Sequence, residues 1–136
     1  MADKIAWPMP SLTPANRPHW EAAKNHELSY QQCLDCGAWI YPIAPMCQAC
    51  WSERFEWRPV SGVGQVSSWI VVRRALHPAF ENEIPYVVAE VDLAEGIRVL
   101  ARTVNLEATD LRAGLPVRAT FRDVDERVSL LLFEPV

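Results

Sequence analysis

The sequence predicts a mainly β protein in three parts: an N-terminal arm with a short helix (residues 1–32), a small metal-binding ribbon (residues 33–57) and a five-stranded barrel (residues 58–136). Three observations carry this prediction. Prolines crowd the first part, two pairs of cysteines mark the second, and short β-branched and aromatic runs separated by turn residues fill the third. A length of 136 residues suits one domain, or one small domain with an appendage.

The first residues are expected to form an extended arm. Pro8, Pro10 and Pro14 fix the backbone and remove amide donors, which excludes a helix interior or a central strand. Trp7 lies within this arm and needs a surface on which to bury its ring. Two possibilities are open: the ring packs back onto its own domain, or it docks on a partner protein.

Residues 18–28 are predicted to form one short helix. Pro18 suits the first helical turn, and apolar residues recur on one face at helical spacing. His19 and His26 lie on or beside this helix. Neither has a partner histidine at ligand spacing, so both are interpreted as packing or surface residues rather than metal ligands.

The four cysteines form two C-x-x-C pairs, Cys33 with Cys36 and Cys47 with Cys50, with ten residues between the pairs. Two such turns facing each other make the tetrahedral four-sulfur cage that zinc prefers. We therefore expect a structural Zn²⁺ site. Iron also fits such a cage, and unliganded buried cysteines or a redox dithiol are the remaining alternatives. Because all four ligands are cysteines, no coordination place is left for substrate.

The two cysteine turns differ in the residue that follows them. Gly37 follows the first pair, where a left-handed backbone is common. Trp51 stands at the matching place after the second pair, which predicts a turn of different construction. Between the pairs, residues 39–41 predict a short strand that leads back to the second turn.

The third part predicts five short strands, with a brief helical turn between the third and the fourth. Gly62-Val63-Gly64 is interpreted as a flexible joint or bulge before the barrel, and Ala94-Glu95-Gly96 as the hairpin between the second and third strands. This order of elements is that of an oligonucleotide/oligosaccharide-binding (OB) barrel. The expected strands cover residues 65–72, 86–92, 98–104, 117–121 and 128–133, and the helical turn falls within 107–113.

The long loop after the first barrel strand carries Arg73, Arg74, His77 and Phe80. OB barrels commonly bind with their second and third strands and the neighbouring loops. Two arginines and a histidine on this loop would suit a phosphate-bearing ligand. The alternative is that the arginines lie on a solvated rim and Phe80 plugs the end of the barrel.

Composition narrows the function classes. A formal charge of −4 disfavours a protein that binds phosphate backbones, and basic and aromatic residues do not alternate along the strands as in single-strand binders. No apolar run is long enough to span a membrane, and the first residues lack the apolar core of a signal peptide, so a cytoplasmic location is expected. The sequence has no nucleophile elbow, phosphate loop or dinucleotide fingerprint.

Besides the two cysteine pairs, several segments in a fixed order resemble the rubredoxin-like zinc-ribbon plus OB-fold family, which is associated with acyl-CoA metabolism. The segments are PHWEAA (18–23), LSYQQC (28–33), SGVG (61–64), PYVVAEVDL (85–93) with Glu95-Gly96, GLPV (114–117) and LFEP (132–135). Two departures concern local packing: His19 stands where the family often has phenylalanine, and Trp51 replaces the usual glycine after the second cysteine pair.

The resemblance implies a small partner of a thiolase-fold enzyme: a thiolase, an acyltransferase or a retro-aldolase that shortens steroid side chains. Other members accompany, or are fused to, enoyl-CoA hydratase-like domains. In such complexes the partner carries the chemistry, and the small subunit scaffolds the assembly and helps to hold the CoA moiety. Under this resemblance Arg73, Arg74 and His77 become the expected contacts to an acyl-CoA ligand.

The leading hypothesis is therefore a non-catalytic, zinc-stabilised accessory subunit in a hetero-oligomer with a thiolase-like catalytic subunit. Two alternatives come from other classes. One is a nucleic-acid-binding ribbon and OB module, which the acidic charge makes unlikely. The other is a stand-alone CoA-ester enzyme.

Overall fold

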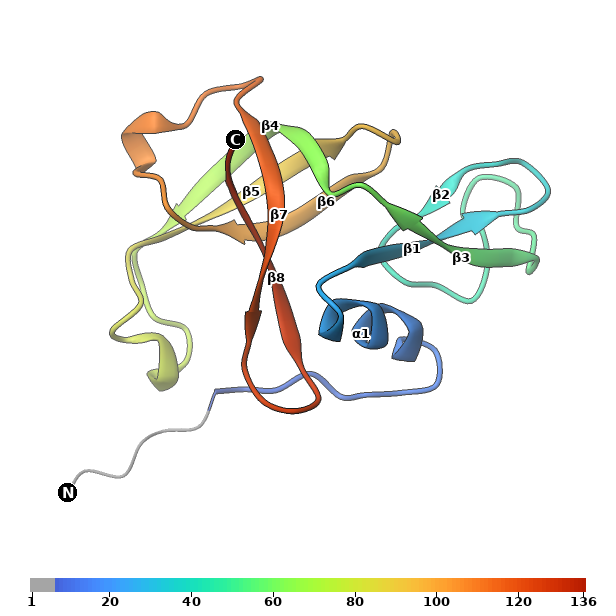
Figure 1. The fold of residues 1–136 in the computed structure, drawn as a ribbon, viewed down its shortest axis with the longest axis horizontal. Helices are drawn as coiled ribbons and strands as arrows, with labels where there is room; N and C mark the ends of the chain where they lie inside the picture. Colours follow the sequence, from blue (N-terminus) through green and yellow to red (C-terminus); the bar gives the residue numbers. More distant parts are fainter. Residues whose placement is uncertain (1–6) are drawn as a thin grey trace.

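The computed structural model describes residues 7–136 and has the mainly β architecture that the sequence predicts (Figure 1). A small three-stranded sheet and a closed five-stranded barrel lie side by side, and one helix packs beneath the small sheet. The elements are α1 (Arg17–Lys24), β1 (Leu28–Cys33), β2 (Trp39–Ile40), β3 (Phe55–Val60), β4 (Val63–Val72), the 3-10 turn η1 (Pro78–Phe80), β5 (Tyr86–Leu93), β6 (Arg98–Thr103), the 3-10 turn η2 (Ala108–Asp110), β7 (Pro116–Asp123) and β8 (Ser129–Pro135).

The helix is shorter than the predicted 18–28. It ends at Lys24 because His26 takes a left-handed conformation with φ 58°. The His26 N–H donates to the Ala23 carbonyl (2.9 Å), and the next N–H donates to the Ala22 carbonyl (2.9 Å). This pattern is a Schellman motif, in which the left-handed residue is usually glycine or asparagine. The chain then turns into β1, a strand that the sequence did not reveal.

The arm folds back onto its own molecule. The Trp7 ring meets Phe80 edge-on, with 5.3 Å between ring centroids, and the guanidinium of Arg122 lies 4.5 Å from the centre of the Trp7 ring. A groove of about 220 Å³ next to Trp7 is lined by residues 130–132 of β8. Of the two possibilities left open for Trp7, the structure shows the intramolecular one. Phe80 also packs against Tyr86, with ring centroids 6.5 Å apart.

The barrel has the strand order β4-β5-β6-β8-β7, with β7 pairing back onto β4. All neighbouring strands are antiparallel except β6 and β8, which run parallel where Arg102 faces Leu132. In β5 every second residue points inward, and Phe133 of β8 is fully buried in the same core. This alternation is typical of a strand with one face on a core. The barrel strands themselves were predicted from short β-branched and aromatic runs between turn residues.

The predicted joint before the barrel is more ordered than expected. Gly64 is a paired residue of β4 opposite Leu93, rather than part of a flexible hinge. A Cβ atom at this position would lie 2.3 Å from the backbone oxygen of Asp92, so the two strands approach too closely for any side chain. The bulge occurs later in β4, between Val66 and Ser68.

The small sheet and the barrel share one buried core. Leu28 and Tyr30 of β1 belong to the same buried cluster as the inward residues of the barrel. The strand β3 runs across residue 57, where the sequence analysis divides ribbon from barrel, and that division stays a prediction. In the part of the chain that the structure describes, no helix is long and apolar enough to cross a membrane.

Candidate metal centre

The first cysteine pair lies in the turn between β1 and β2. Cys33 is the last residue of β1, and its N–H donates to the Ala38 carbonyl (2.8 Å). The Gly37 N–H donates back to the Cys33 carbonyl (3.1 Å), with Gly37 at φ 78°. These two bonds close a tight turn that places Cys36 beside Cys33.

The second pair is built in the same way, so the expectation of a different turn is wrong. The Cys47 N–H donates to the Ser52 carbonyl (2.8 Å), and the Trp51 N–H donates to the Cys47 carbonyl (2.8 Å). Trp51 reproduces the left-handed conformation of Gly37 with φ 65°. The closing hydrogen bond fixes this backbone geometry. Trp51 adopts the left-handed conformation, although a glycine at the same position would adopt it with less strain.

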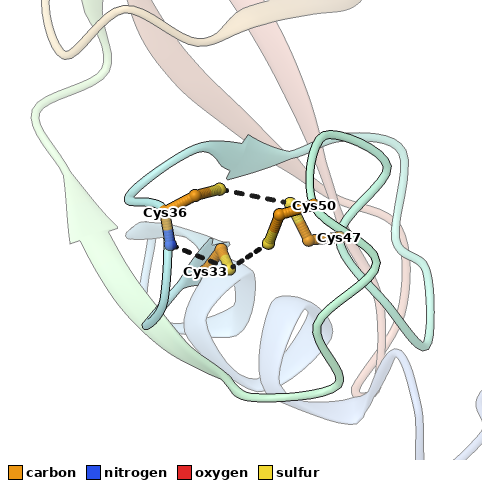
Figure 2. Close-up of side chains that lie close together, drawn as sticks. All are labelled: Cys33, Cys36, Cys47 and Cys50. Carbon is orange, nitrogen blue, oxygen red and sulfur yellow. Dashed lines mark hydrogen bonds between the residues drawn. The ribbon is translucent and has the colours of Figure 1, made fainter.

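The two turns bring all four sulfur atoms together (Figure 2). The Sγ atoms of Cys33 and Cys50 lie 3.6 Å apart, as do those of Cys36 and Cys47. All four Sγ atoms lie within 4.8 Å of one another. A tetrahedral ion with metal–sulfur distances of ~2.3 Å requires edges of ~3.8 Å between sulfurs, so the cluster has the dimensions of a metal cage. The same distances are much too long for disulfide bonds.

Backbone amides favour the thiolate form that metal binding needs. The Cys36 N–H points at the Cys33 sulfur (3.5 Å), and the Ala49 N–H at the Cys47 sulfur (3.4 Å). The Cys36 amide, helped by that of Asp35, lowers the pKa of the Cys33 thiol to about 6. The neighbouring sulfurs act in the opposite direction at Cys36 and Cys50, where they outweigh the backbone amides and raise the pKa of the thiol. Thiolates are the metal ligands, and a bound cation would offset the repulsion between them.

A polar network that the cysteine spacing did not reveal joins the two turns. Asp35 accepts hydrogen bonds from the Arg54 guanidinium (2.7 Å) and from the Ser52 hydroxyl. Buried Gln31 of β1 holds the loop before the second pair by two bonds to the Ala44 backbone, of 2.9 and 3.0 Å. Each of these bonds joins residues far apart in the chain, and no local motif signals them.

The predicted ligand-binding loop lies between β4 and β5. Arg73 and Arg74 are exposed, and neither forms an ion pair with another residue in 7–136. His77 has a structural role, because its Nδ1 accepts the N–H of Ala79 (3.1 Å) at the start of η1. Only its Nε2 is then left for a ligand. The assignment of these three residues as CoA contacts stays a prediction.

Arg73 also borders a cavity of about 210 Å³ at this end of the barrel, together with Tyr86 and Arg102. The guanidinium of Arg102 stacks on the Tyr86 ring at 4.4 Å and contacts Glu83 at 3.4 Å. Arg102 is therefore already paired, whereas Arg73 has no ion-pair partner among the described residues.

The outer face of β5 and β6, which OB barrels commonly use for ligands, is not basic here. Asp92 and Glu90 both pair with Arg98, at 2.6 and 3.4 Å, and the Arg98 guanidinium lowers the pKa of Asp92. Arg102 lies on the same face of β6 and pairs with Glu83, so the two arginines of these strands are balanced by the two carboxylates Glu90 and Asp92. This charge balance does not suit a phosphate backbone.

Two family models match the chain: the rubredoxin-like zinc ribbon domain of ChsH2 over residues 20–56, and the C-terminal OB-fold domain of ChsH2 over residues 57–122. A solved structure described as the Ltp2-ChsH2(DUF35) aldolase contains a chain with 35% sequence identity and a TM-score of 0.81. The match covers 93% of this chain and 98% of that one.

Two relatives of this chain differ in length. A probable enoyl-CoA hydratase alpha subunit of Thermomonospora curvata is 38% identical over 97% of this chain, but the chain spans only 41% of that protein. A DUF35 domain-containing scaffold protein of Methanocaldococcus jannaschii is 34% identical, and the match covers 70% of this chain and 67% of the relative. The chain thus spans less than half the length of the hydratase subunit and most of the scaffold protein. It belongs to the DUF35 family of ChsH2-like proteins, in which a rubredoxin-like zinc ribbon precedes a C-terminal OB-fold domain.

Proposed function

We propose that the chain is a non-catalytic subunit that binds a structural zinc ion and assembles with a thiolase-like catalytic subunit acting on acyl-CoA esters. One observation carries this proposal: the match over 98% of a chain in the Ltp2-ChsH2(DUF35) aldolase, at a TM-score of 0.81. Relatives named as a hydratase alpha subunit and as scaffold proteins support the same role.

The geometry supports a structural rather than a catalytic metal. Within residues 7–136 the four cysteines are the only group of three or more metal-binding side chains whose donor atoms converge. Four sulfur ligands complete a tetrahedron and leave no place for water or substrate. A metal held in this way stabilises the ribbon and performs no chemistry on a thioester, so the reacting groups belong to the partner.

The proposed ligands are Cys33, Cys36, Cys47 and Cys50, and the proposed ion is Zn²⁺. Zinc and iron both accept four thiolates in this geometry. Elemental analysis of protein purified without added metal distinguishes them. One zinc per chain in a colourless protein is expected, and a coloured protein with one iron per chain would replace zinc by iron.

The first experiment tests assembly. The chain is co-expressed with each thiolase-like protein of its own organism, and the mass of any purified complex and its acyl-CoA activity are measured. A hetero-oligomer is expected that turns over acyl-CoA, whereas this chain alone does not. A chain that stays separate and leaves the enzyme's activity unchanged, or that turns over acyl-CoA unaided, contradicts the proposal.

The second experiment tests the CoA contacts. Arg73, Arg74 and His77 are proposed to contact the CoA phosphates, supported by the exposed, unpaired charge of the two arginines among the described residues. In the complex, Arg73→Ala with Arg74→Ala is expected to weaken CoA binding about tenfold or more, because charged hydrogen bonds to phosphate are lost. Arg127→Ala, in the β7–β8 hairpin, is the control for the loss of one exposed positive charge outside this loop. Equal CoA affinity in the double variant and the control removes this loop from the proposed site.

A further inference from the structure

The two cysteine turns provide an internal comparison within one molecule. They share the same pair of closing hydrogen bonds, so Gly37 and Trp51 occupy equivalent positions with φ of 78° and 65°. Glycine adopts this conformation freely, whereas a bulky side chain adopts it with strain. The second turn therefore carries a residue that its own backbone geometry disfavours.

The other non-glycine residues at positive φ use their side chains within the molecule. His26 stacks on Phe121 and contacts Asp123 at 2.9 Å, and the Asn105 amide donates to Glu134 at 3.0 Å. Such contacts explain why a strained residue is kept at each place.

Trp51 has no such internal use. Trp51 is 71% exposed to solvent. In the part of the chain that the structure describes, no aromatic pair, cation–π contact or side-chain hydrogen bond involves its ring. The strain at Trp51 is therefore not offset inside this molecule.

The surroundings of Trp51 fit a protein partner better than a nucleic acid or a membrane. The adjacent Ser52 belongs to the network with Asp35 and Arg54, in which one negative and one positive charge are paired. An aromatic residue beside a charge-balanced polar network has the anatomy of a protein–protein contact. A net charge of −4 disfavours both a phosphate backbone and an anionic lipid surface.

The backbone that carries the ring is fixed in advance of binding. The Trp51 backbone is fixed by its bond to Cys47, and Cys47 and Cys50 on its N-terminal side belong to the sulfur cluster. A tryptophan on a fixed backbone has only two side-chain torsions left to order on association, which favours affinity. We propose that Trp51 is the anchor by which the ribbon binds the thiolase-like catalytic subunit. This inference rests on the proposed function and adds to it the point of attachment.

The test uses Trp51→Gly in the full chain, with zinc content checked to match the wild type. Because the glycine relieves backbone strain, the melting temperature of the isolated variant is expected to rise. Its affinity for the thiolase-like protein that co-purifies with the wild-type chain is expected to fall about tenfold or more, mainly through faster dissociation. A stability gain together with a binding loss is a combination that general damage to the ribbon cannot produce.

Two further variants separate the ring from the backbone. Trp51→Asn keeps a residue that tolerates the left-handed conformation but removes the ring, and it is expected to bind as weakly as Trp51→Gly. Trp51→Phe keeps an aromatic ring and is expected to retain affinity within about threefold of the wild type.

Several outcomes overturn the inference, and they can be told apart. If the wild type binds the partner and Trp51→Gly binds it equally well, the anchor is wrong and the proposed function stands. If Trp51→Gly melts below the wild type, the strain argument is wrong. If the wild-type chain alone self-associates and Trp51→Gly does not, the ring contacts a second copy instead. If the wild type binds no thiolase-like protein, the proposed function itself fails.

Discussion

At the scale of single residues, the ribbon depends on its sulfur atoms because it has little apolar core of its own. The buried residues of its separate cluster are only three, and two of them are cysteines: Cys33, Ile40 and Cys47. Burial of so few side chains cannot stabilise an independent element, and small elements of this kind draw their folding free energy from the metal.

Replacing one ligand tests this dependence. Cys36→Ser is expected to lose most of the bound metal and to lower the free energy of unfolding by about 3 kcal/mol or more, because the cage opens on its exposed side. Metal content by elemental analysis and thermal melting measure the two effects. Leu34→Ser, an exposed substitution in the same turn, is the control and should keep one ion per chain. Full metal content in Cys36→Ser would show that the four sulfurs are not the ligand set.

His19 provides a prediction for pH dependence. The ring packs against Trp20 and Tyr30, and its Nδ1 is buried without a hydrogen-bond partner among the described residues. Burial lowers the pKa of His19 below its ordinary value of 6.5. As pH falls below 6.5, His19 is therefore protonated in the unfolded chain but stays neutral in the folded protein. The free energy of unfolding falls by up to about 1.4 kcal/mol for each unit by which the His19 pKa is lower in the folded than in the unfolded state.

The substitution His19→Phe removes this titration. The variant is expected to lose less stability than the wild type when urea unfolding is compared at pH 8 and pH 5. The change in the free energy of unfolding between the two pH values is compared between variant and wild type. The carboxylates titrate in both proteins, so their contribution cancels and that of His19 remains. Parallel losses in the two proteins would mean that the His19 pKa is not depressed.

At the scale of elements, the backbones of β4 and β5 approach each other closely at Gly64. A Cβ atom would lie 2.3 Å from the Asp92 oxygen, so Gly64→Ala is expected to lower the free energy of unfolding by about 3 kcal/mol or more. The matched control is Gly114→Ala, where φ is 88° but nothing lies within 4 Å of the new Cβ atom. The control is expected to cost about 1 kcal/mol from strain alone. Denaturant unfolding of both variants measures the difference, and equal losses would rule out the steric cause.

The elements also show which parts of the fold sequence reasoning reaches. The strand β5 is recognisable because buried and exposed residues alternate along it. The strands β1 and β3 were missed for physical reasons. In β1, Gln31 is buried and satisfied by the Ala44 backbone, which hides the apolar pattern. In β3, Pro59 and charged residues give the composition of an edge strand.

In the candidate site, too, some features could be predicted from the sequence and others could not. The cysteine cluster follows from spacing, because a C-x-x-C turn constrains its own geometry. The network of Asp35, Ser52 and Arg54 joins residues from different turns, and only the folded structure brings them together. Trp51 was noticed in the sequence as an unusual residue, but its left-handed conformation and its exposure depend on the closing hydrogen bond to Cys47.

At the scale of the whole molecule, the ribbon and the barrel are fastened together at several points. The Glu95 carboxylate in the β5–β6 hairpin accepts the Ser61 N–H (2.6 Å), and the Glu95 carbonyl accepts the Trp39 indole N–H (3.2 Å). The hydroxyl of Tyr41 accepts the Leu100 N–H (3.2 Å). Because of these contacts and the shared core, we expect the ribbon and the barrel to unfold as one cooperative unit.

Removal of the metal is therefore expected to lower the stability of both the ribbon and the barrel. Treatment with a strong chelator is expected to lower the melting temperature of the whole chain, because a loosened ribbon also loosens its share of the common core. Backbone circular dichroism and tryptophan fluorescence should report the same single transition. The chelator presaturated with zinc is the control. A barrel transition that stays at its original temperature would show that the two parts unfold independently.

The Glu95 contacts have a consequence for the cell under the proposed function. They join the ribbon to the hairpin between β5 and β6, so loss of the ion from the ribbon would be expected to loosen this hairpin and to disturb how the barrel binds its enzyme. In an organism starved of zinc, thioester turnover would then fail although every residue of the enzyme's own active site is intact.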